Sequence, residues 1–539
     1  MNLGTGQNAW RRTKYLRAAR NLSWNRAAAP FPNFRESLQA FANHPVGVRI
    51  CQLFLIGLLS LGGMTTSGGE VQISVAVDPT RSGPEIPGDY AGLSYEVAAI
   101  LPYPDGHYYF SPTNQPLINV FQTLGIGHLR IGGNTSDRDA VHLPVPADFD
   151  SLFAFARAAR VKVIYCLRLH HGSPAEAAST AKYLYDHYAE FLDAISIGQE
   201  PSAYPVETED KRPANERMGQ GAEHYSYEAY RAEWKRFAAA ILEAVPAARF
   251  AGPGVHNNAR WTQRFLANFG RSNHVGLATA HLYPGGAGGK VPTPEAGRAR
   301  MLSSDFLAGY EKLWAGSLPA VRANSLAFRL EEVNNFYNGG AKDVSDTYAA
   351  ALWGLEFMHW WAAHGAAGIN FHTGDRVAAG ANLFPSKYSA IATSANGYSV
   401  RPLGYGLQMF ALGGHGRYVP VEFTGRGTGS TNISLFAVLQ DDRTLTLTVI
   451  NKSFGSEAVT AQVKVSAKHY LGEKAIWLTT PQGDVAVKTG MKVGGQGINP
   501  DGSWSGNWGS LNPAGPGELR LMVPPASAQV ARLKPVSAP

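Results

Sequence analysis

Two segments of this chain each place a glutamate where an apolar, strand-like run gives way to a loop. Residues 197–202 (IGQEPS) contain Glu200, and residues 328–335 (FRLEEVNN) contain Glu332. Two carboxyl groups that face one pocket can cleave a glycosidic bond, because one protonates the leaving oxygen while the other attacks the sugar carbon. These residue types point to that chemistry, provided that the fold brings the two segments together.

The elements that must position the two glutamates alternate between strands and helices from residue 90 to residue 375. Predicted strands are 90–95, 128–131, 161–167, 194–197, 250–251, 276–282, 326–330 and 368–371. Predicted helices, with apolar residues at three-and-four spacing, are 116–124, 149–160, 174–192, 226–245, 261–269, 299–314 and 347–363. Eight strands in this order predict a (β/α)8 TIM barrel, an α/β fold whose catalytic groups lie at the C-terminal ends of the strands. Glu200 and Glu332 fall just past the fourth and seventh predicted strands, which face each other across the barrel mouth.

The character of the sequence changes after about residue 405. Short β-type runs follow at 432–439, 444–451, 458–465, 475–479, 518–523 and 528–533, without helical periodicity and with a long polar loop at 494–517. This pattern predicts a C-terminal antiparallel β-sandwich, to which the alternating run 71–77 is expected to add a strand. We therefore divide the chain into a basic leader (1–69), a strand segment joining the sandwich (70–88), a catalytic barrel (89–404) and the sandwich (405–539).

The positive charge of the chain lies almost wholly in its leader. The formal charge is +7, and residues 1–49 hold eight basic side chains against one acid, so that 40 basic and 40 acidic residues remain in the other 490. A neutral body gives no reason to expect a nucleic acid as partner. No Cys/His spacing suggests a metal and no glycine-rich phosphate loop is present, so we expect neither a metal nor a cofactor.

An apolar run at 50–63 follows the basic leader and ends in small residues, which is typical of a secretory signal. We expect export, to the periplasm or the medium, with cleavage within 62–70. The alternatives are a later start codon, a buried helix, or an uncleaved type II anchor that would hold the protein at a membrane. Cleavage would remove Cys51 and leave Cys166, inside the apolar run 161–169, as a buried structural thiol.

Several motifs resemble a known family once they are considered together. Residues 198–201 (GQEP) resemble the Asn-Glu-Pro acid/base signature of the clan of retaining (β/α)8 glycosidases. Within that clan the chain is most similar to glycoside hydrolase family 79, which includes β-glucuronidases and heparanase. The similarity covers roughly residues 70–539 and is carried further by 92–96 (GLSYE), 129–134 (LRIGGN), 281–283 (HLY) and 332–340 (EVNNFYNGG).

The resemblance implies a role for each matching residue. Glu200 is expected to be the acid/base, and Glu332 the nucleophile, with a hydrogen bond from Tyr283. Groups expected to receive a glucuronate carboxylate are Tyr337, Asn338 and Tyr388, and those expected to hold sugar hydroxyls are Ser94, Glu96, Asn134 and Asp137. Gln199 occupies the position of the usual Asn, which bonds the sugar 2-hydroxyl, and offers the same amide on a longer arm.

Simpler interpretations compete at several of these positions. Glu331 competes with Glu332, and strand alternation allows only one of two adjacent side chains to face the pocket; the family match downstream favours Glu332. Asn134 and Asp137 could cap turns, and His170 and His171 could be solvated loop residues. The tryptophans expected to lie in the core rather than at a sugar are Trp353, Trp360 and Trp361.

The resemblance thus implies an exported retaining glycoside hydrolase without a cofactor, and we expect an exo-acting β-glucuronidase whose partner is a glucuronate-containing glycan or glycoside. For a retaining enzyme we expect the two carboxyl groups ~5–5.5 Å apart. Two alternatives share the fold: an endo-acting heparanase- or hyaluronidase-like enzyme and a β-glucosidase. A third, of another class, is a catalytically silent carbohydrate-binding protein, against which the presence of both glutamates argues.

Overall fold

The computed structural model describes residues 69–204, 225–375, 385–427, 432–512, 515 and 517–536. The predicted leader up to residue 68, with its apolar run, lies outside the described residues. Among the helices that are described, none is both long enough and apolar enough to cross a bilayer.

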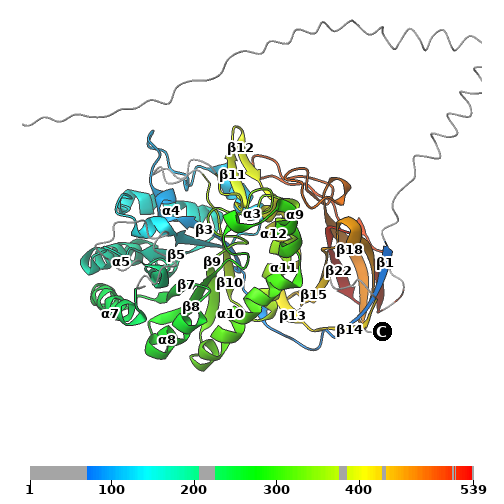
Figure 1. The fold of residues 1–539 in the computed structure, drawn as a ribbon, viewed down its shortest axis with the longest axis horizontal. Coiled ribbons are helices and arrows are strands. Elements are labelled where there is room, and N and C mark those ends of the chain that lie inside the picture. Colours follow the sequence, from blue (N-terminus) through cyan, green and yellow to red (C-terminus); the bar gives the residue numbers. More distant parts are fainter. Residues whose placement is uncertain are drawn as a thin grey trace, which may run out of the picture. The chain divides into compact units, whose positions relative to one another are not determined.

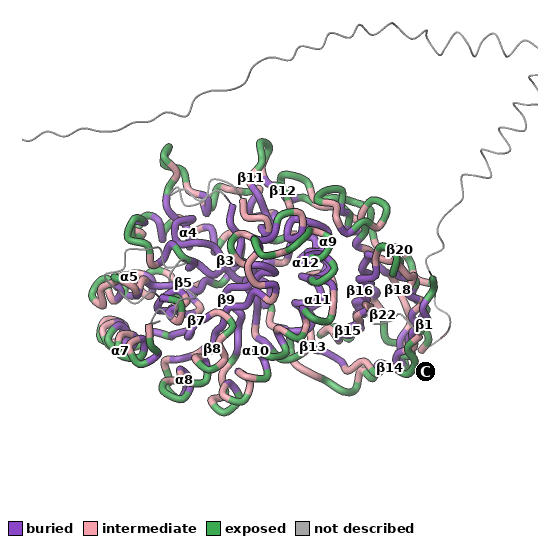
Figure 2. Tube along the Cα trace, in the orientation of Figure 1, coloured by how far each residue is buried: buried purple, intermediate pink, exposed green. Residues whose placement is uncertain are grey.

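Eight parallel strands close into a barrel in the order β10-β3-β4-β5-β6-β7-β8-β9 (Figure 1). Their bounds are β3 Ala91–Glu96, β4 His128–Gly132, β5 Lys162–Leu167, β6 Leu192–Ile197, β7 Phe250–His256, β8 Val275–Leu282, β9 Ala327–Val333 and β10 Gly368–His372. These strands are buried along most of their length (Figure 2), which explains why they read as apolar runs rather than as alternating ones. The predicted TIM barrel is confirmed.

Helices follow the barrel strands and cover them. They are α3 Gln115–Thr123, α4 Pro146–Ala159, α5 Pro174–Tyr188, α7 Tyr227–Ala244, α8 Ala259–Phe269, α9 Pro294–Met301, α10 Ser304–Ala323, α11 Tyr348–Ala363 and α12 Pro402–Gly413. Side chains that accept a backbone N–H begin several of them: Asn114 caps α3 and Ser226 caps α7. The single helix predicted at 299–314 is wrong, because Ser303 accepts the N–H of Asp305 and starts α10 anew after α9 ends.

The remaining strands form two larger sheets and one hairpin. One sheet has the order β14-β1-β17-β21 and the other β19-β18-β22-β16-β15-β13-β2, and β11 pairs with β12. The bounds of their main strands are β1 Gly69–Val77, β13 Gly416–Val419, β14 Val421–Arg426, β15 Ile433–Leu439, β16 Leu445–Asn451, β17 Val459–Ser466, β18 Tyr470–Thr479, β21 Glu518–Val523 and β22 Ser527–Pro535; the short ones are β2 Glu85–Ile86, β11 Ile391–Ser394, β12 Gly397–Val400, β19 Lys492–Val493 and β20 Gly509–Ser510. All pairings in the two sheets are antiparallel except β1 with β17. Buried residues alternate along β1 and β21, as expected where one sheet face covers a core.

The apolar helices α11 and α12 pack against each other, and both also contact the sheet that contains β16, β18 and β22. In α11, Trp353 and Trp361 are completely buried and Trp360 nearly so, which confirms their prediction as core residues. The expectation that no helix lies beyond residue 405 is wrong for α12. This helix has almost no polar face because it is buried nearly all round, and a helix without an amphipathic pattern gives no periodic signal. A Cβ on Gly406 would lie 2.5 Å from the carbonyl oxygen of Ala351, so glycine permits the close approach of the two helices.

Candidate active site

Glu200 lies on the loop directly after β6, at the C-terminal end of the barrel. Its backbone adopts the left-handed region, with φ +46°, and caps the short 3-10 helix Pro201–Ala203. A non-glycine residue with positive φ is uncommon and costs conformational energy, which is typical of functional loops. The side chain is 22% exposed, and its Oε1 lies 2.8 Å from Nδ1 of His281.

Glu332 lies inside β9, almost completely buried, and both of its carboxylate oxygens are engaged. Tyr283 donates its hydroxyl to Oε1 at 2.9 Å, the hydrogen bond that the sequence predicts. Arg130 donates from Nη1 to Oε2 at 2.8 Å, and Gln199 donates from Nε2 to Oε2 at 3.0 Å. Such a carboxylate is fixed in direction and held by donors that favour its ionised form.

The charges around Glu332 decide its ionisation. Burial by itself would raise the pKa of Glu332, but His372, His281 and Arg130 and the hydrogen bond from Gln199 together hold this pKa far below its usual range. The pKa of His281 shifts in the opposite direction, because the attraction of Glu332, Glu200 and Glu331 overcomes the effect of burial and raises it to about 9. The site therefore pairs an ionised carboxylate with cationic neighbours.

The two glutamates predicted to act together do meet in the structure. A carboxylate oxygen of Glu200, a ring nitrogen of His281 and a carboxylate oxygen of Glu332 all lie within 4.8 Å of one another. Glu200 comes from the loop after β6 and Glu332 from β9, so closure of the barrel brings together residues that are far apart in the sequence. The side chain of Glu200 is partly exposed whereas that of Glu332 is buried, so the two carboxyl groups lie in unequal environments.

The expectation that only one of the adjacent glutamates can point inward is wrong. Ala280 pairs with Leu330, but the next residue of β8, His281, pairs with Glu332, so Glu331 is an extra residue in β9. Such a β-bulge interrupts the alternation of side chains. Glu331 is completely buried and accepts a hydrogen bond from Thr279 of β8 at 2.8 Å, while Glu332 reaches Arg130 of β4.

Gln199 and Asp137 organise the loops that carry the site. The side-chain oxygen of Gln199 accepts from Nη2 of Arg130 at 2.5 Å and from the backbone N–H of Gly133 at 3.1 Å. Asp137 accepts four hydrogen bonds, from the backbone N–H groups of Leu169, His170 and Gln199 and from the hydroxyl of Tyr204. Asp137 thus ties together the loops after β4, β5 and β6, which agrees with its alternative interpretation as a turn-stabilising residue.

The other residues predicted to hold sugar hydroxyls lie at different depths. Ser94 is completely buried and its hydroxyl contacts Nδ1 of His372 at 3.2 Å and Nη1 of Arg130 at 3.4 Å. Glu96 is also buried and accepts two hydrogen bonds from Thr135 at 2.7 Å. Asn134, by contrast, is exposed at the start of the turn after β4, where a ligand could reach it.

Three tyrosines predicted from the sequence gather beside Glu332. The Tyr283 ring lies 6.2 Å from that of Tyr337 and 6.3 Å from that of Tyr388, measured between centroids. The backbone holds their loops together, because Tyr337 donates to Gly286 at 2.9 Å. Asn338 is exposed in the same loop with φ +60°. The arrangement gives the pocket aromatic faces and phenolic hydroxyls.

Sequence reasoning assigned no role to three of the groups that hold the pair. Arg130 and His281 lie inside motifs that the resemblance quotes, and His372 ends β10 one residue beyond the predicted strand. All three are completely or almost completely buried. Their position as basic residues within apolar barrel strands was the available signal, because a buried cation requires a buried anion.

A metal ion fits the Glu200, His281 and Glu332 cluster poorly. Although three possible ligand atoms lie close together, the imidazole nitrogen faces Glu200 at hydrogen-bond distance and the Arg130 guanidinium is 2.8 Å from Glu332. A divalent cation would have to displace or repel these positive groups. The cluster already has its counter-charges.

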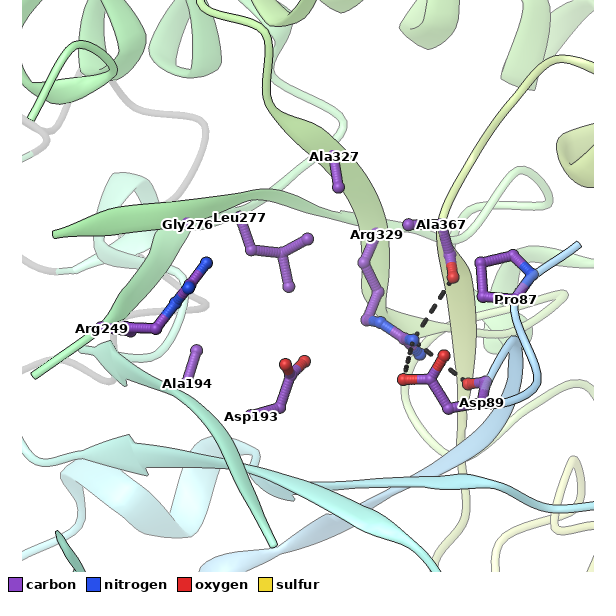
Figure 3. Close-up of a pocket in the computed structure, with 10 residues that line it drawn as sticks. All are labelled: Pro87, Asp89, Asp193, Ala194, Arg249, Gly276, Leu277, Ala327, Arg329 and Ala367. Atoms are coloured by element: carbon purple, nitrogen blue, oxygen red, sulfur yellow. Dashed lines mark hydrogen bonds and ion pairs between the residues drawn. The ribbon is translucent and has the colours of Figure 1, made fainter. Parts of the chain in front are cut away.

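A separate polar pocket of about 230 Å³ lies at the opposite end of the barrel (Figure 3). Its lining residues begin strands or precede them: Pro87, Asp89, Asp193, Ala194, Arg249, Gly276, Leu277, Ala327, Arg329 and Ala367. Two of its residues pair at 3.1 Å, Arg329 and Asp89, and its Asp193 also contacts the buried His128 at 3.3 Å. Because this end of a TIM barrel serves stability and Arg329 already occupies Asp89, we assign the pocket no part in the chemistry.

Comparisons with known proteins bear on the fold. No family model and no curated protein sequence matches the chain. Among solved structures, a 4-O-α-L-rhamnosyl-β-D-glucuronidase from Fusarium oxysporum 12S, in complex with Rha-GlcA, superposes with a TM-score of 0.64 at 18% identity, covering 85% of this chain and 99% of its own. The family 51 arabinofuranosidase from Xanthomonas axonopodis pv. citri gives 0.62 at 13% identity, covering 86% and 100%. A family 44 xyloglucanase from Paenibacillus polymyxa gives 0.56 at 12% identity, covering 86% and 100%. The chain is similar in fold to these glycoside hydrolases along nearly their whole length.

Proposed function

We propose that the protein is a retaining glycoside hydrolase that removes terminal β-linked glucuronate from glycans or glycosides. The observation that carries the proposal is the pair Glu200 and Glu332, with an oxygen of each within 4.8 Å of the other. A short separation of this kind suits a nucleophile that reaches the sugar carbon directly, whereas inverting enzymes leave room for a water at ~6.5–9.5 Å.

In the first step Glu332 attacks the anomeric carbon while Glu200 gives its proton to the leaving oxygen. Tyr283 and Arg130 hold the attacking carboxylate in one orientation, so little reorganisation precedes bond formation. As the ester forms, Glu332 loses its negative charge, and the bond between the sugar and the leaving oxygen breaks as that oxygen takes the proton of Glu200.

In the second step Glu200, now ionised, takes a proton from the water that attacks the glycosyl-enzyme bond. Glu200 suits this exchange because its side chain is 22% exposed while that of Glu332 is 7% exposed. The group that trades protons with solvent and the group that forms the covalent bond are therefore distinct.

The glucuronate assignment rests on the donors that surround the pair. Removing a uronate carboxylate from water is costly unless the pocket supplies hydrogen bonds. Tyr283 donates its only hydroxyl proton to Glu332, so the phenol groups proposed to receive the carboxylate are those of Tyr337 and Tyr388, whose rings lie 6.2 and 6.3 Å from the Tyr283 ring. The solved glucuronidase of similar fold acts on a β-D-glucuronide, which supports the same sugar class here. The neutral body of the chain, with equal numbers of acids and bases after residue 49, favours exo action over binding along a polyanion.

The test is a panel of p-nitrophenyl glycosides with purified protein, comprising the β-glucuronide, the β-glucoside and the α-L-arabinofuranoside. We expect the β-glucuronide to be cleaved at least about tenfold faster than the others, a difference that one or two well-placed polar contacts can supply. Glu332→Gln should abolish this activity, and Glu200→Gln should slow turnover of the glycosyl-enzyme.

Each alternative has its own result in this panel. Preference for the glucoside or the arabinofuranoside refutes the uronate assignment but keeps the retaining mechanism. Cleavage of polymeric glucuronans without any activity on the small β-glucuronide indicates endo action. Binding of glucuronides without cleavage, unchanged in both variants, indicates a carbohydrate-binding protein. Analysis of the first-formed anomer by NMR separates retention from inversion.

A further inference from the structure

Glu331 is a buried carboxylate in the reaction centre that the proposed mechanism does not use. Its Oε1 lies 2.8 Å from the hydroxyl of Thr279 and 3.6 Å from Nε2 of His281. Within the described part of the chain, neither its Oε2 nor Nε2 of His281 has a hydrogen-bond partner. Burying an ionised carboxylate with so few partners is costly, so its position next to the imidazole calls for a physical reason.

The backbone makes room for this carboxylate in two ways. The bulge in β9 turns Glu331 inward together with Glu332. On β7, which is separated from β9 by β8, a Cβ at Gly254 would lie 2.4 Å from Oε1 of Glu331, and the φ of +61° there also favours glycine. Two separate strands are thus shaped around one side chain, which a simple packing role does not require.

His281 connects Glu331 with the residue proposed as the acid. Its ring presents Nε2 to Glu331 at 3.6 Å and Nδ1 to Oε1 of Glu200 at 2.8 Å. The three groups form a line of carboxylate, imidazole and carboxylate. In such a line, the charge next to one ring nitrogen determines whether the other nitrogen carries a proton and donates a hydrogen bond to its partner.

We propose that Glu331 is a positioning residue for the acid step: it balances the charge of His281 from the Nε2 side and so lets Glu200 keep its proton. The Nδ1–H then donates to Oε1 of Glu200, which leaves the proton of the acid on Oε2, available to the leaving oxygen. Without Glu331, the imidazolium charge would be balanced by Glu200 itself, which would favour the ionised form of Glu200. This role rests on the proposed function.

The groups that can influence His281 come from several elements. Glu200 follows β6, His256 lies on β7, and Glu331 and Glu332 lie on β9; all four affect its charge or are affected by it. Arg130 on β4 acts on both glutamates of β9. Of these, Glu331 is the only carboxylate on the Nε2 side of the ring for which a contact with His281 is recorded among the described residues.

The test is Glu331→Gln, which removes the charge and keeps the shape, assayed on two substrates that differ in their need for an acid. The alcohol of an alkyl β-glucuronide is a poor leaving group and departs only when the acid protonates its oxygen, whereas the 2,4-dinitrophenolate of a dinitrophenyl β-glucuronide departs as an anion without that proton. We expect kcat/KM to fall on the order of tenfold or more for the alkyl substrate and less than about twofold for the dinitrophenyl substrate. Glu331→Asp, which keeps the charge, should restore most of the activity on the alkyl substrate.

Glu356→Gln is the matched control, because Glu356 is another buried glutamate but pairs with Lys452, away from Glu200. It should change both substrates equally. An equal loss on both substrates in Glu331→Gln, or no loss on either, overturns the positioning role. If Glu331→Gln does not fold, Thr279→Val is the second variant, because it removes the hydroxyl that fixes Oε1 of Glu331. It should lower kcat/KM on the alkyl substrate, by a smaller factor, and leave the dinitrophenyl substrate unchanged. An equal loss on both substrates overturns the role. A wild-type protein that cleaves neither substrate refutes the proposed function and this role with it.

Discussion

Arg130 provides the sharpest test of how the barrel keeps its nucleophile ionised. Its Nη1 lies 2.8 Å from Oε2 of Glu332, and its side chain is 1% exposed. At that distance, two unit charges in a protein with an effective dielectric constant of about 20 attract each other by about 6 kcal/mol. Arg130→Met removes this attraction together with the hydrogen bond to Gln199, while His281 and His372 continue to favour the ionised carboxylate.

The expected consequence is a new acid limb in the pH profile of kcat/KM. The nucleophile must be ionised, and a depressed pKa keeps it so until the pH falls through that pKa. In the wild-type protein the pKa of Glu332 lies far below its usual range, so acid should not reduce activity through this group while the protein is folded. In Arg130→Met the pKa rises towards or beyond that of ordinary carboxyl groups, which titrate near pH 4 to 5, and kcat/KM should fall as the pH drops through that region.

Arg329→Met is the matched control for this experiment. Arg329 is equally buried and also forms an ion pair, with Asp89 at 3.1 Å, but at the opposite end of the barrel. Arg130→Met leaves the buried Glu332 without this cation and is expected to cost about 3–5 kcal/mol of stability. Asp89 is 33% exposed, so Arg329→Met is expected to cost less, and the folded fractions of both variants are measured first by circular dichroism. A profile for Arg130→Met that keeps the wild-type shape would refute the reasoning, because His281 and His372 would then suffice.

Two further predictions concern stability. Gly406→Ala places a Cβ 2.5 Å from the carbonyl oxygen of Ala351 and should cost about 1–3 kcal/mol, seen as a lower Tm, whereas Gly289→Ala, where the space is open, should change it little. Lys452→Met leaves the buried Glu356 without its cation, 2.7 Å away, and should cost about 3–5 kcal/mol; replacing Glu356 as well should restore much of the loss, and an unchanged Tm in either damaging variant would contradict the packing described.

The strands of the barrel could be predicted because strands that are buried on both faces appear in the sequence as continuous apolar runs. Apolar runs such as 161–167 and 276–282 correspond to β5 and β8 within one or two residues. The same burial hid α12, since a helix buried nearly all round has no polar face to set its period. The break between α9 and α10 depends on the hydroxyl of Ser303, which caps the start of α10. The spacing of apolar residues, on which the helix prediction was based, carries no information about such a cap.

The two glutamates could be predicted, but most of their support could not. The roles of Glu200 and Glu332 could be predicted from their motifs and from the order of the strands. The roles of Arg130, His281 and His372 could not, because only closure of the barrel places these residues near Glu332. The inward turn of Glu331 was inaccessible to alternation, because a single inserted residue in β9 resets the pattern. Positions that depend on a bulge or on distant charges require the fold itself.

The charges around Glu332 suggest why its partner can hold a proton. The carboxyl groups in this network are Glu96, Glu200, Glu331 and Glu332, and the cations are Arg130, His281 and His372. Four acids against three cations leave one negative charge in excess, and a proton on one acid removes it. Cations and hydrogen-bond donors hold the pKa values of Glu96, Glu331 and Glu332 below their usual range, so these three stay ionised and Glu200 is left as the acid of the set that we propose to carry the proton. A bound uronate would add one more negative charge and hold that proton more firmly. If the proposed uronate is held by the phenol groups of Tyr337 and Tyr388, no cation cancels its charge at those contacts, and that charge continues to favour the protonated acid.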